Sequence, residues 1–272
     1  MRTIGADLGG TWLRLCLTDP LRGVLLRLRV PALPLDRLAP AFREALAKER
    51  FPRPDLLVLG STGIWSASRR AAAQRSLKGL ARRVLVVSDI ELAQAAAFAG
   101  GPGILVVGGT GSVAFGRDGR GKSLRAGGLG ALLGDEGSAF WVGRQALRDP
   151  SLRRKLGARG DLGVVHAPRP AAAVASLAPA VFRLAARDEG FARIRSQAAR
   201  HLAGLAAEVR AGLPFRGPAP VSWRGGLFHD PRFLSGFLAA LADMGGFAPR
   251  PALLEAEVAA ALLPPHVLLG RA

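Results

Sequence analysis

Short apolar runs separated by glycine-rich bends open the chain and predict β-strands. Three strands are expected within the first thirty residues, where "TWLRLCLT" alternates between two kinds of side chain and "DPLRG" forms a turn. Apolar positions recur at helical spacing across residues 35–50, which predicts a helix there. A buried-type strand "LLVLGST", a helix over residues 66–83 and an all-apolar strand "VLVVSD" ending at Asp89 follow. Apolar strands between helices are typical of sheets that are covered on both faces.

The same pattern returns further along the chain. A helix expected over residues 90–99 leads into "GILVVGGTGSVAFGRDGRGKSLRAGG", which predicts three strands joined by a glycine bend and a tight turn. A strand, a bend of glycine and threonine, and a returning strand thus occur at residues 4–17 and again at 104–115, which indicates two lobes built on one plan. The remainder is predicted to be mostly helical, with one strand at "APVSWRGG". We expect an N-terminal lobe of residues 1–99 and a C-terminal lobe of 100–272, whose last helix is free to pack back on the first lobe.

Length and charge narrow the class of protein. A chain of 272 residues accommodates two lobes with cores of their own, and its apolar runs stay well short of the roughly 20 residues that span a bilayer. The start shows no signal-peptide layout, so we expect a soluble cytoplasmic protein without a membrane partner. The net charge of +18 would suggest nucleic-acid binding, but the arginines are spread through every segment without interleaved aromatic residues. We therefore expect no nucleic-acid partner, and attraction of anionic ligands such as nucleotides.

Cysteine and histidine are too sparse for several kinds of site. The single cysteine, Cys16, excludes intrachain disulfides, C-x-x-C zinc sites and iron–sulfur clusters held within one chain. Its place in an alternating strand is typical of a small core residue. The four histidines are scattered without H-x-x-x-H spacing, which argues against a histidine metal site.

One motif, "GRDGRGKS" from Gly116 to Ser123, matches the phosphate-loop pattern G-x-x-x-x-G-K-[ST]. A phosphate loop opens a helix, whose backbone N–H groups converge on the phosphates. Here the next residues, "LRAGGLGALLG", contain four glycines that disfavour a helix beginning at Lys122. Asp-Gly between two strand-like runs is instead a hairpin signal, so we predict a tight turn in place of a nucleotide site.

The two outer glycine bends are better placed to hold phosphates. In "DLGGTW" the glycines allow close approach of the backbone to a polyphosphate, Thr11 offers a hydroxyl, and Asp7 offers a carboxylate for a hydrated Mg²⁺. The segment "GGTGS" at residues 108–112 repeats this arrangement about a hundred residues later. A matching pair, one per lobe, indicates a shared function.

The order of these motifs resembles a known family. The segments "GADLGGTW", "VSD", "GILVVGGTGSVAFG", "GGLGALLGDEGSAFWVGRQAL" and "SWRGGLF" are similar to the N-acetylglucosamine kinase and BadF/BadG/BcrA/BcrD-type ATPase family, within the sugar kinase, actin and heat-shock chaperone superfamily. The resemblance spans most of the chain, and "GDEGSAFWVGRQAL" is its most specific part. It implies an α/β, two-lobed actin-like ATPase (ribonuclease H-like) fold, in which each lobe is a mixed sheet flanked by helices and the nucleotide lies in the cleft.

The resemblance also implies an activity and its residues. It implies an ATP-dependent kinase that uses Mg²⁺ and transfers the γ-phosphoryl group to a hydroxyl of a sugar or amino sugar, N-acetylglucosamine or glucosamine-like. Asp89 would be the catalytic base and would touch the substrate, with Gly128 and Asp135 also lining the sugar pocket. A homodimer is one assembly that we consider. The implied ATP-binding residues are Asp7, which also contacts Mg²⁺ through water, Gly9, Gly10, Thr11, Gly109, Thr110, Gly111, Ser112, Gly225 and Gly226.

Several of these residues have an alternative interpretation as structural residues. Asp89 could cap the helix that follows it, and Asp135 and Glu136 could be first-turn residues that favour a helix dipole. Gly225 and Gly226 fit a strand-to-helix turn equally well. The role of Glu136 stays open.

The sequence also departs from the family in ways that affect the substrate. Family members commonly place an asparagine after the third strand to help recognise the sugar, whereas this chain has no asparagine and carries "RVPALPLDRL" there. Trp12 stands where a basic residue is usual, and Leu129 where an aromatic residue is frequent. Two alternatives remain: a BadF-type ATPase that activates another enzyme, for which the cysteines of a shared cluster are lacking, and a nucleotide-sensing regulatory protein without turnover.

Overall fold

The computed structural model describes residues 1–48 and 52–270, which form two compact units. The first unit comprises residues 1–101 and 252–272, and the second comprises residues 102–251. The expected boundary between residues 99 and 100 lies two residues before this one, and the last segment, which was expected to be free to pack back on the first lobe, is part of the first unit.

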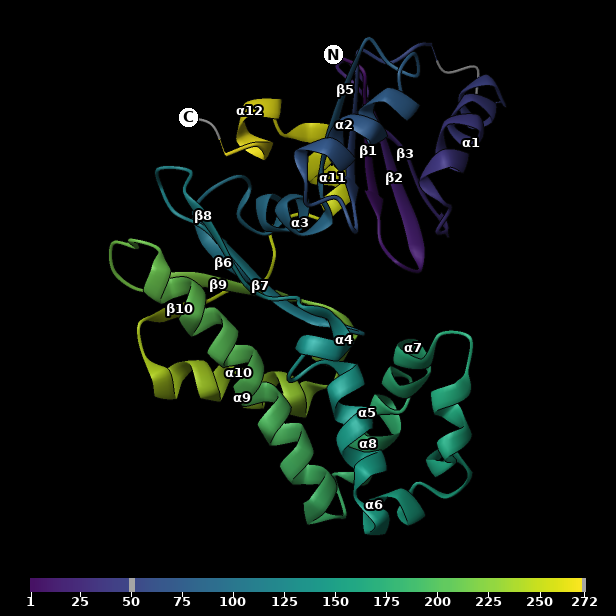
Figure 1. The fold of residues 1–272 in the computed structure, drawn as a ribbon. Helices are drawn as coiled ribbons and strands as arrows, with labels where there is room; N and C mark the ends of the chain where they lie inside the picture. The colour runs from purple at the N-terminus through teal and green to yellow at the C-terminus, as the bar shows by residue number, and fades with distance from the viewer. Residues whose placement is uncertain (49–51, 271–272) are drawn as a thin grey trace. The chain divides into compact units, whose positions relative to one another are not determined.

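The first unit is a mixed sheet with helices on both faces (Figure 1). The strand order is β3-β2-β1-β4-β5; β1, β2 and β3 are antiparallel neighbours, whereas β4 and β5 run parallel to β1. Its elements are β1 (Thr3–Leu8), β2 (Trp12–Asp19), β3 (Gly23–Pro31), α1 (Leu35–Lys48), β4 (Leu56–Ser61), α2 (Ala67–Ser76), β5 (Arg83–Ser88), α3 (Asp89–Phe98), α11 (Ala256–Leu262) and α12 (Pro265–Leu268).

The core of the first unit lies on the two faces of this sheet. Leu57 and Leu59 of β4 pack with residues of α1 and α2, whereas Leu56 and Val58 of the same strand pack with α3 and α11. The alternation along β4 therefore buries both faces, as its continuous apolar sequence predicts. Cys16 is fully buried, and burial raises the pKa of its thiol, so the thiol stays protonated in the core.

The C-terminal helix α11 lies directly on β1. Gly5 allows this contact, because a Cβ there would lie within 3.0 Å of the Glu257 carbonyl oxygen and the Ala261 backbone nitrogen. An ion pair between Arg27 of β3 and the buried Glu257 adds a polar link between sheet and helix. The return of the chain end thus completes one face of the first sheet.

The second unit repeats the plan of the first sheet. The order β10-β9-β6-β7-β8 has β6, β7 and β8 as antiparallel neighbours, with β9 and β10 parallel to β6. Helices α9 and α10 run side by side, and α9 packs on β6, β7 and β8 (Figure 1). Its elements are β6 (Gly103–Gly108), β7 (Ser112–Arg117), β8 (Ser123–Gly127), α4 (Gly130–Leu133), α5 (Ala139–Arg148), α6 (Pro150–Lys155), short 3₁₀ turns at Gly157–Gly160, Leu162–His166 and Gly226–His229, α7 (Pro170–Ala175), α8 (Ala178–Leu184), α9 (Glu189–Gly212), β9 (Ala219–Arg224), α10 (Pro231–Met244) and β10 (Phe247–Pro249).

The predicted fold class, an α/β protein with two mixed sheets flanked by helices, is confirmed. Two local predictions were wrong. The helix expected over residues 66–83 ends at Ser76, and Gly79 adopts a φ of 92° beyond it, which a right-handed helix does not allow. The short strand β10 was missed. Across the described ranges, no helix has both the length and the apolar character needed to cross a membrane.

Candidate functional site

The first glycine bend is a tight hairpin between β1 and β2. The Gly9 N–H donates to the Trp12 carbonyl at 2.9 Å, which leaves Gly10 and Thr11 exposed at the turn. The Thr62 N–H, just beyond β4, donates to the Leu8 carbonyl at 3.1 Å and fixes the base of the hairpin against the neighbouring strand. Exposed backbone and a hydroxyl at such a turn can donate hydrogen bonds to phosphate oxygens.

Asp7 and Asp89 lie at the same edge of the first sheet. Leu8, Ser61 and Ser88 are in register at the carboxyl ends of β1, β4 and β5, so Asp7 lies one residue inside this edge and Asp89 one residue beyond it. With neighbouring strands about 4.8 Å apart, β1 and β5 are roughly 10 Å apart. The edge thus combines a glycine hairpin with two carboxylates.

Asp7 forms an ion pair that the sequence analysis missed. Arg14 Nη1 donates to Asp7 Oδ2 at 3.1 Å, with the aspartate side chain 4% exposed and the arginine side chain 30% exposed. The two residues are directly opposite each other across the hairpin. The position of the turn in the sequence could have predicted this pair. In a hairpin centred between Gly10 and Thr11, two residues face each other when their numbers add up to 21.

Ser88, and not Asp89, caps helix α3. The Ser88 hydroxyl accepts from the Glu91 N–H at 3.3 Å, and a Glu91 carboxylate oxygen accepts from the Ser88 N–H at 2.9 Å, which completes a capping box. Asp89 is the first residue of the helix and is half-buried. The alternative of Asp89 as the N-cap is therefore wrong, whereas its role as a base stays a prediction.

A cavity of about 450 Å³ opens in the first unit near this edge. Its lining includes Leu35 and Asp36, from the segment after the third strand, together with Thr62, Gly63 and Arg69. The Arg69 guanidinium donates to the Gly63 carbonyl at 2.9 Å, which orders the loop after β4. Cavities of roughly 300–1,000 Å³ accommodate small-molecule ligands, and this mostly apolar lining also carries polar side chains, those of Asp36, Thr62, Arg69 and Ser76.

The Asp135 side chain packs against the second glycine bend and supports it. The Ser112 N–H donates to Asp135 Oδ1 at 3.1 Å, and a Cβ at Gly111 would lie 2.8 Å from both carboxylate oxygens. Asp135 is buried and adopts a φ of 64°, a conformation that non-glycine residues rarely adopt. Asp135 is thus built into the hairpin, and it precedes the first turn of α5, which begins at Ala139.

The start of α5 holds the same bend in position. The Ala139 N–H donates to the Gly109 carbonyl at 2.8 Å, and the Phe140 N–H donates to the Thr110 carbonyl at 3.2 Å. The Ser112 hydroxyl donates to the Glu136 carbonyl at 2.8 Å. The Gly109 N–H donates to the Gly111 carbonyl at 3.0 Å and the Ser112 N–H donates to Asp135, so the groups left to bind a ligand are the N–H groups of Thr110 and Gly111 and the exposed Thr110 hydroxyl. Glu136, like Asp135, lies before α5, so the first-turn interpretation of both residues was wrong.

Gly128 and Gly225 adjoin the same bend. The Gly128 N–H donates to the Ser112 carbonyl at 2.8 Å. Gly225, with a φ of 115°, lies so close to Gly108 that a Cβ would fall within 3.0 Å of its backbone. Gly226 has open space around it. The sequence-predicted residues of the second unit therefore meet around one hairpin.

The phosphate-loop match "GRDGRGKS" is confirmed as a hairpin turn. Strands β7 and β8 pair on either side of it, and the Asp118 side chain accepts from the N–H groups of Arg120 at 2.9 Å and Lys122 at 2.8 Å. Strand β8 begins at Ser123, where a phosphate loop would begin a helix.

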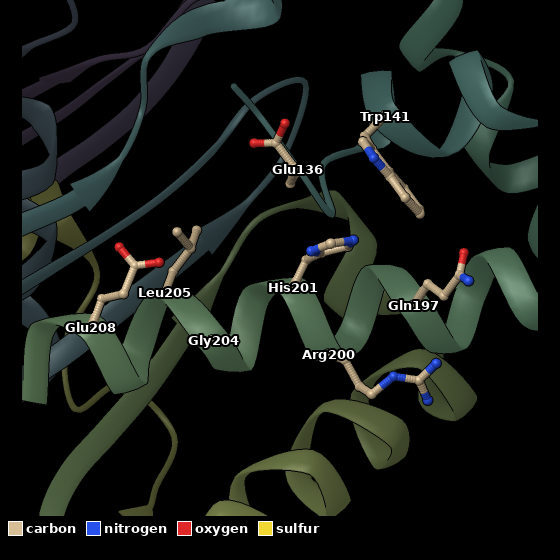
Figure 2. A pocket seen from close by; sticks show the side chains of 8 residues that line it. All are labelled: Glu136, Trp141, Gln197, Arg200, His201, Gly204, Leu205 and Glu208. Atoms are coloured by element: carbon tan, nitrogen blue, oxygen red, sulfur yellow. The ribbon is translucent and has the colours of Figure 1, made fainter. Parts of the chain in front are cut away.

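A second cavity, of about 720 Å³, lies along α9 in the second unit. Figure 2 shows His201 next to the Trp141 ring, with Glu136 on the same side of α9 and Arg200 on the opposite side of the helix. The rings of Trp141 and His201 are arranged edge to face, and their centroids are 5.0 Å apart. Carboxylates, an imidazole and an aromatic edge together can bind a polar ligand with an apolar face. The lining residues are Glu136, Trp141, Gln197, Arg200, His201, Gly204, Leu205 and Glu208.

The donor set around the first hairpin fits a magnesium ion that arrives with a nucleotide. Mg²⁺ is usually held by one or two carboxylates together with phosphates and water, and Asp7 supplies a buried carboxylate beside the turn. In the part of the chain that the structure describes, no group of three or more His, Cys, Asp or Glu side chains could hold a metal ion. A cage built from protein ligands is thus not part of the described site.

Comparison with known proteins gives a family and a fold. The model of the BadF/BadG/BcrA/BcrD ATPase family matches residues 4–263. An N-acetylmuramic acid/N-acetylglucosamine kinase from Clostridium acetobutylicum is 43% identical over 74 residues, which are 27% of this chain and 24% of that protein. The match thus spans about a quarter of the length of this curated relative.

Solved structures share the whole architecture. A candidate N-acetylglucosamine kinase from Chromobacterium violaceum superposes with a TM-score of 0.73 at 24% identity, over 96% of this chain and 98% of that one. A ROK-family glucokinase from Streptomyces griseus, solved with glucose and AMPPNP, superposes with a TM-score of 0.62 at 18% identity, over 96% and 98% of the two chains. This chain therefore shares their fold.

Proposed function

Since the chain belongs to the BadF/BadG/BcrA/BcrD ATPase family, we propose that it is an ATP-dependent kinase that transfers the γ-phosphoryl group of ATP to a hydroxyl of a sugar. One observation carries the proposal: Gly109–Ser112, Asp135, Gly128 and Gly225 gather around one hairpin although they come from distant parts of the sequence. The names of the curated relative and of the structural neighbours support the same activity.

In this proposal the second unit holds most of the nucleotide. The N–H groups of Thr110 and Gly111 and the Thr110 hydroxyl bind phosphate oxygens, because the N–H groups of Gly109 and Ser112 already donate to the Gly111 carbonyl and to Asp135. Gly226 has open space around it and lies against the adenosine. Gly225 keeps that segment in place by its contact with Gly108.

The first unit contributes the other phosphate contacts. Gly9, Gly10 and Thr11 form a second hairpin of the same design, and Asp7 lies beneath it. Asp7 would hold Mg²⁺ through water, and the bound ion would neutralise charge on the transferred phosphoryl group. Each unit thus has one glycine hairpin of this design for phosphate oxygens.

Asp89 is proposed as the catalytic base. Its position just beyond the carboxyl edge of the first sheet puts a half-buried carboxylate near the hairpin. In the reaction the sugar hydroxyl oxygen bonds to the γ-phosphorus, the bond from that phosphorus to ADP breaks, and Asp89 accepts the hydroxyl proton. Since the transition state is loose, positioning and charge neutralisation contribute most of the rate enhancement.

The proposed substrate class is an amino sugar, N-acetylglucosamine or glucosamine-like. A sugar in the cavity of the first unit would lie beside Asp89. Thr62 lines this cavity, and Thr62 and Asp89 directly follow two residues that are paired on the neighbouring strands β4 and β5. Asp36 lies in the segment where the family commonly has an asparagine, and its carboxylate can accept hydrogen bonds from sugar hydroxyls.

A coupled assay of ADP release tests this function. Purified protein is incubated with Mg-ATP and glucose, glucosamine, N-acetylglucosamine or N-acetylmuramic acid, and the Asp89→Asn variant serves as the control. We expect ADP release that requires a sugar and has its highest kcat/KM with an amino sugar. ATP hydrolysis that is independent of sugar would favour the activating ATPase, and ATP binding without turnover would favour the regulatory protein. The buried Cys16 argues against a cluster-holding activator.

A further inference from the structure

We propose that Arg70 and Glu91 form a positioning pair, which fixes one wall of the sugar cavity against the segment that carries the proposed base. This inference rests on the proposed function, since it takes Asp89 as the base and the cavity of about 450 Å³ in the first unit as the sugar site. All of these residues belong to the first unit.

Helix α2 forms one wall of that cavity, and the residues through which it does so are Arg69, Ala72, Ala73 and Ser76. The helix has little apolar packing: among its ten residues, all of which the structure describes, only Ala73 is buried. Tertiary packing of an apolar face is what usually holds a short helix in place. The position of this cavity wall therefore depends on polar contacts of α2 as well.

Arg70 supplies such a contact, which joins α2 to α3. Its Nη2 lies 2.9 Å from each carboxylate oxygen of Glu91, and the two side chains are only 27% and 21% exposed. Water and salt screen a partly buried ion pair less than an exposed one, so this pair is held more firmly than a surface pair. The first turn of α3 is thus tied to the wall of the cavity.

Glu91 connects this ion pair to the proposed base. Its Oε2 accepts from the Ser88 N–H and from the Ser88 hydroxyl, each at 2.9 Å, and its own N–H donates to that hydroxyl at 3.3 Å. Asp89 lies between these two residues in the sequence, and its Oδ1 accepts from the Ile90 N–H at 2.9 Å. The backbone on both sides of Asp89 is therefore fixed by a chain of bonds that begins at Arg70.

Loss of the Arg70 charge should impair use of the sugar and spare the nucleotide. The phosphate contacts proposed for the first unit come from the hairpin at residues 9–11, which is anchored by the Trp12 carbonyl and the Thr62 N–H. The sugar cavity and Asp89 are instead the two features that the pair joins. The kcat/KM for the sugar should therefore fall while the KM of ATP stays nearly unchanged. A general loss of folded protein would lower the active fraction and change neither KM.

Arg82 offers a control at the other end of the same strand. It directly precedes β5 and pairs with Asp55 at 3.5 Å, whereas Ser88 is the last residue of β5. The six residues of this strand span roughly 20 Å, so Arg82 is remote from Asp89. Arg70→Met and Arg82→Met each remove one guanidinium from an ion pair of the first unit, and only the first of these pairs adjoins the base.

The experiment is steady-state kinetics with Mg-ATP and N-acetylglucosamine, or glucosamine if that is the better substrate, with thermal unfolding as a check of folding. We expect Arg70→Met to lower the kcat/KM for the sugar at least about fivefold and to leave the KM of ATP within about twofold. Arg70→Lys keeps the charge, so it should stay within about twofold of wild type, as should Arg82→Met.

A double-mutant cycle with Glu91→Gln tests whether the two residues act as one unit. This substitution keeps an oxygen acceptor for Ser88 and removes the charge that holds Arg70. We expect Glu91→Gln to resemble Arg70→Met, and the double variant to lie within about twofold of the weaker single variant. Losses that multiply in the double variant would show that the residues act independently and would overturn the proposal.

A loss in Arg70→Met of less than about fivefold would also overturn the proposal. The same holds for an equal loss in Arg70→Lys or in Arg82→Met, and for an equal effect on the KM of ATP. If neither Arg70→Met nor Glu91→Gln folds, the pair is structural and the proposal is overturned. A wild-type protein that releases no ADP with any sugar of the panel would instead contradict the proposed function, so the two failures are distinguishable.

Discussion

Gly225 and Gly226 are adjacent glycines for which the structure predicts opposite effects of the same substitution. Gly225 has a φ of 115°, and a Cβ there would meet the nitrogen, carbon and oxygen of Gly108. Gly226 has no left-handed φ, and within the described residues a Cβ there would have no atom within 4 Å. Gly225→Ala should therefore be costly and Gly226→Ala nearly neutral.

The expected cost at Gly225 has two parts. Holding alanine in a sparsely populated backbone region costs about 1–3 kcal/mol, and forcing a methyl group into a packed site costs about 1–3 kcal/mol more. The sum, roughly 2–6 kcal/mol, is a large share of the 5–15 kcal/mol that typically stabilises a domain. Gly226→Ala should stay within about 1 kcal/mol of wild type, because loss of glycine flexibility in the unfolded chain slightly favours folding.

Urea unfolding followed by tryptophan fluorescence measures both values, since Trp223 lies in the adjoining strand β9. Calorimetry with ATP then separates stability from binding. If Gly226 lies against the adenosine, Gly226→Ala should fold normally and bind ATP at least about fivefold more weakly, because its methyl group occupies ligand space. A Gly225→Ala variant within about 1 kcal/mol of wild type would refute the packing argument, as would an equal cost at Gly226.

Three further predictions follow from the site and the core. Asp89→Asn should lower turnover at least about a hundredfold in the ADP-release assay yet change stability by less than about 1 kcal/mol, since Ser88 keeps the cap; more than a tenth of wild-type turnover would remove Asp89 from the base role. Lys122→Ala should shift stability by at most about 0.5 kcal/mol and leave the ATP Kd unchanged, whereas Thr110→Val should weaken ATP binding in the same calorimetric titration; the reverse result would make "GRDGRGKS" the nucleotide site. Gly5→Ala should cost about 1–3 kcal/mol or more in urea unfolding, because α11 must move off β1, and an unchanged midpoint would contradict that contact.

Local signals explain which parts of the fold could be predicted from the sequence. Both glycine hairpins and the turn at Asp118 depend on residues a few positions apart, so the pattern alone locates them. Helix α2 was predicted too long because Leu77, Leu80 and Ala81 continue its apolar spacing, although they reach the core from a turn that contains Gly79. Strand β10 has three residues and is defined by its pairing with β9, which no local pattern reveals.

The same limit applies to predicting the candidate site from the sequence. The resemblance supplied its residues, but the capping box of Ser88 and the support of Gly111 by Asp135 depend on three-dimensional neighbours. Asp135 was predicted to contact the sugar, and its contact with the Ser112 N–H shows that it supports the second glycine hairpin. Arg14 lies in the alternating segment "TWLRLCLT", and its pairing with Asp7 could have been derived from the position of the turn.

The late position of α11 in the chain sets an order for folding during synthesis. Strand β1 is complete by residue 8, but the helix that covers Gly5 is made of residues 256–262. At about 5–20 residues per second, the ribosome needs roughly ten seconds or more to add the intervening chain. The second unit is complete at residue 251, when the part of the first sheet that α11 covers is still exposed. A nascent chain of this protein should therefore bind chaperones through its first hundred residues until its end emerges.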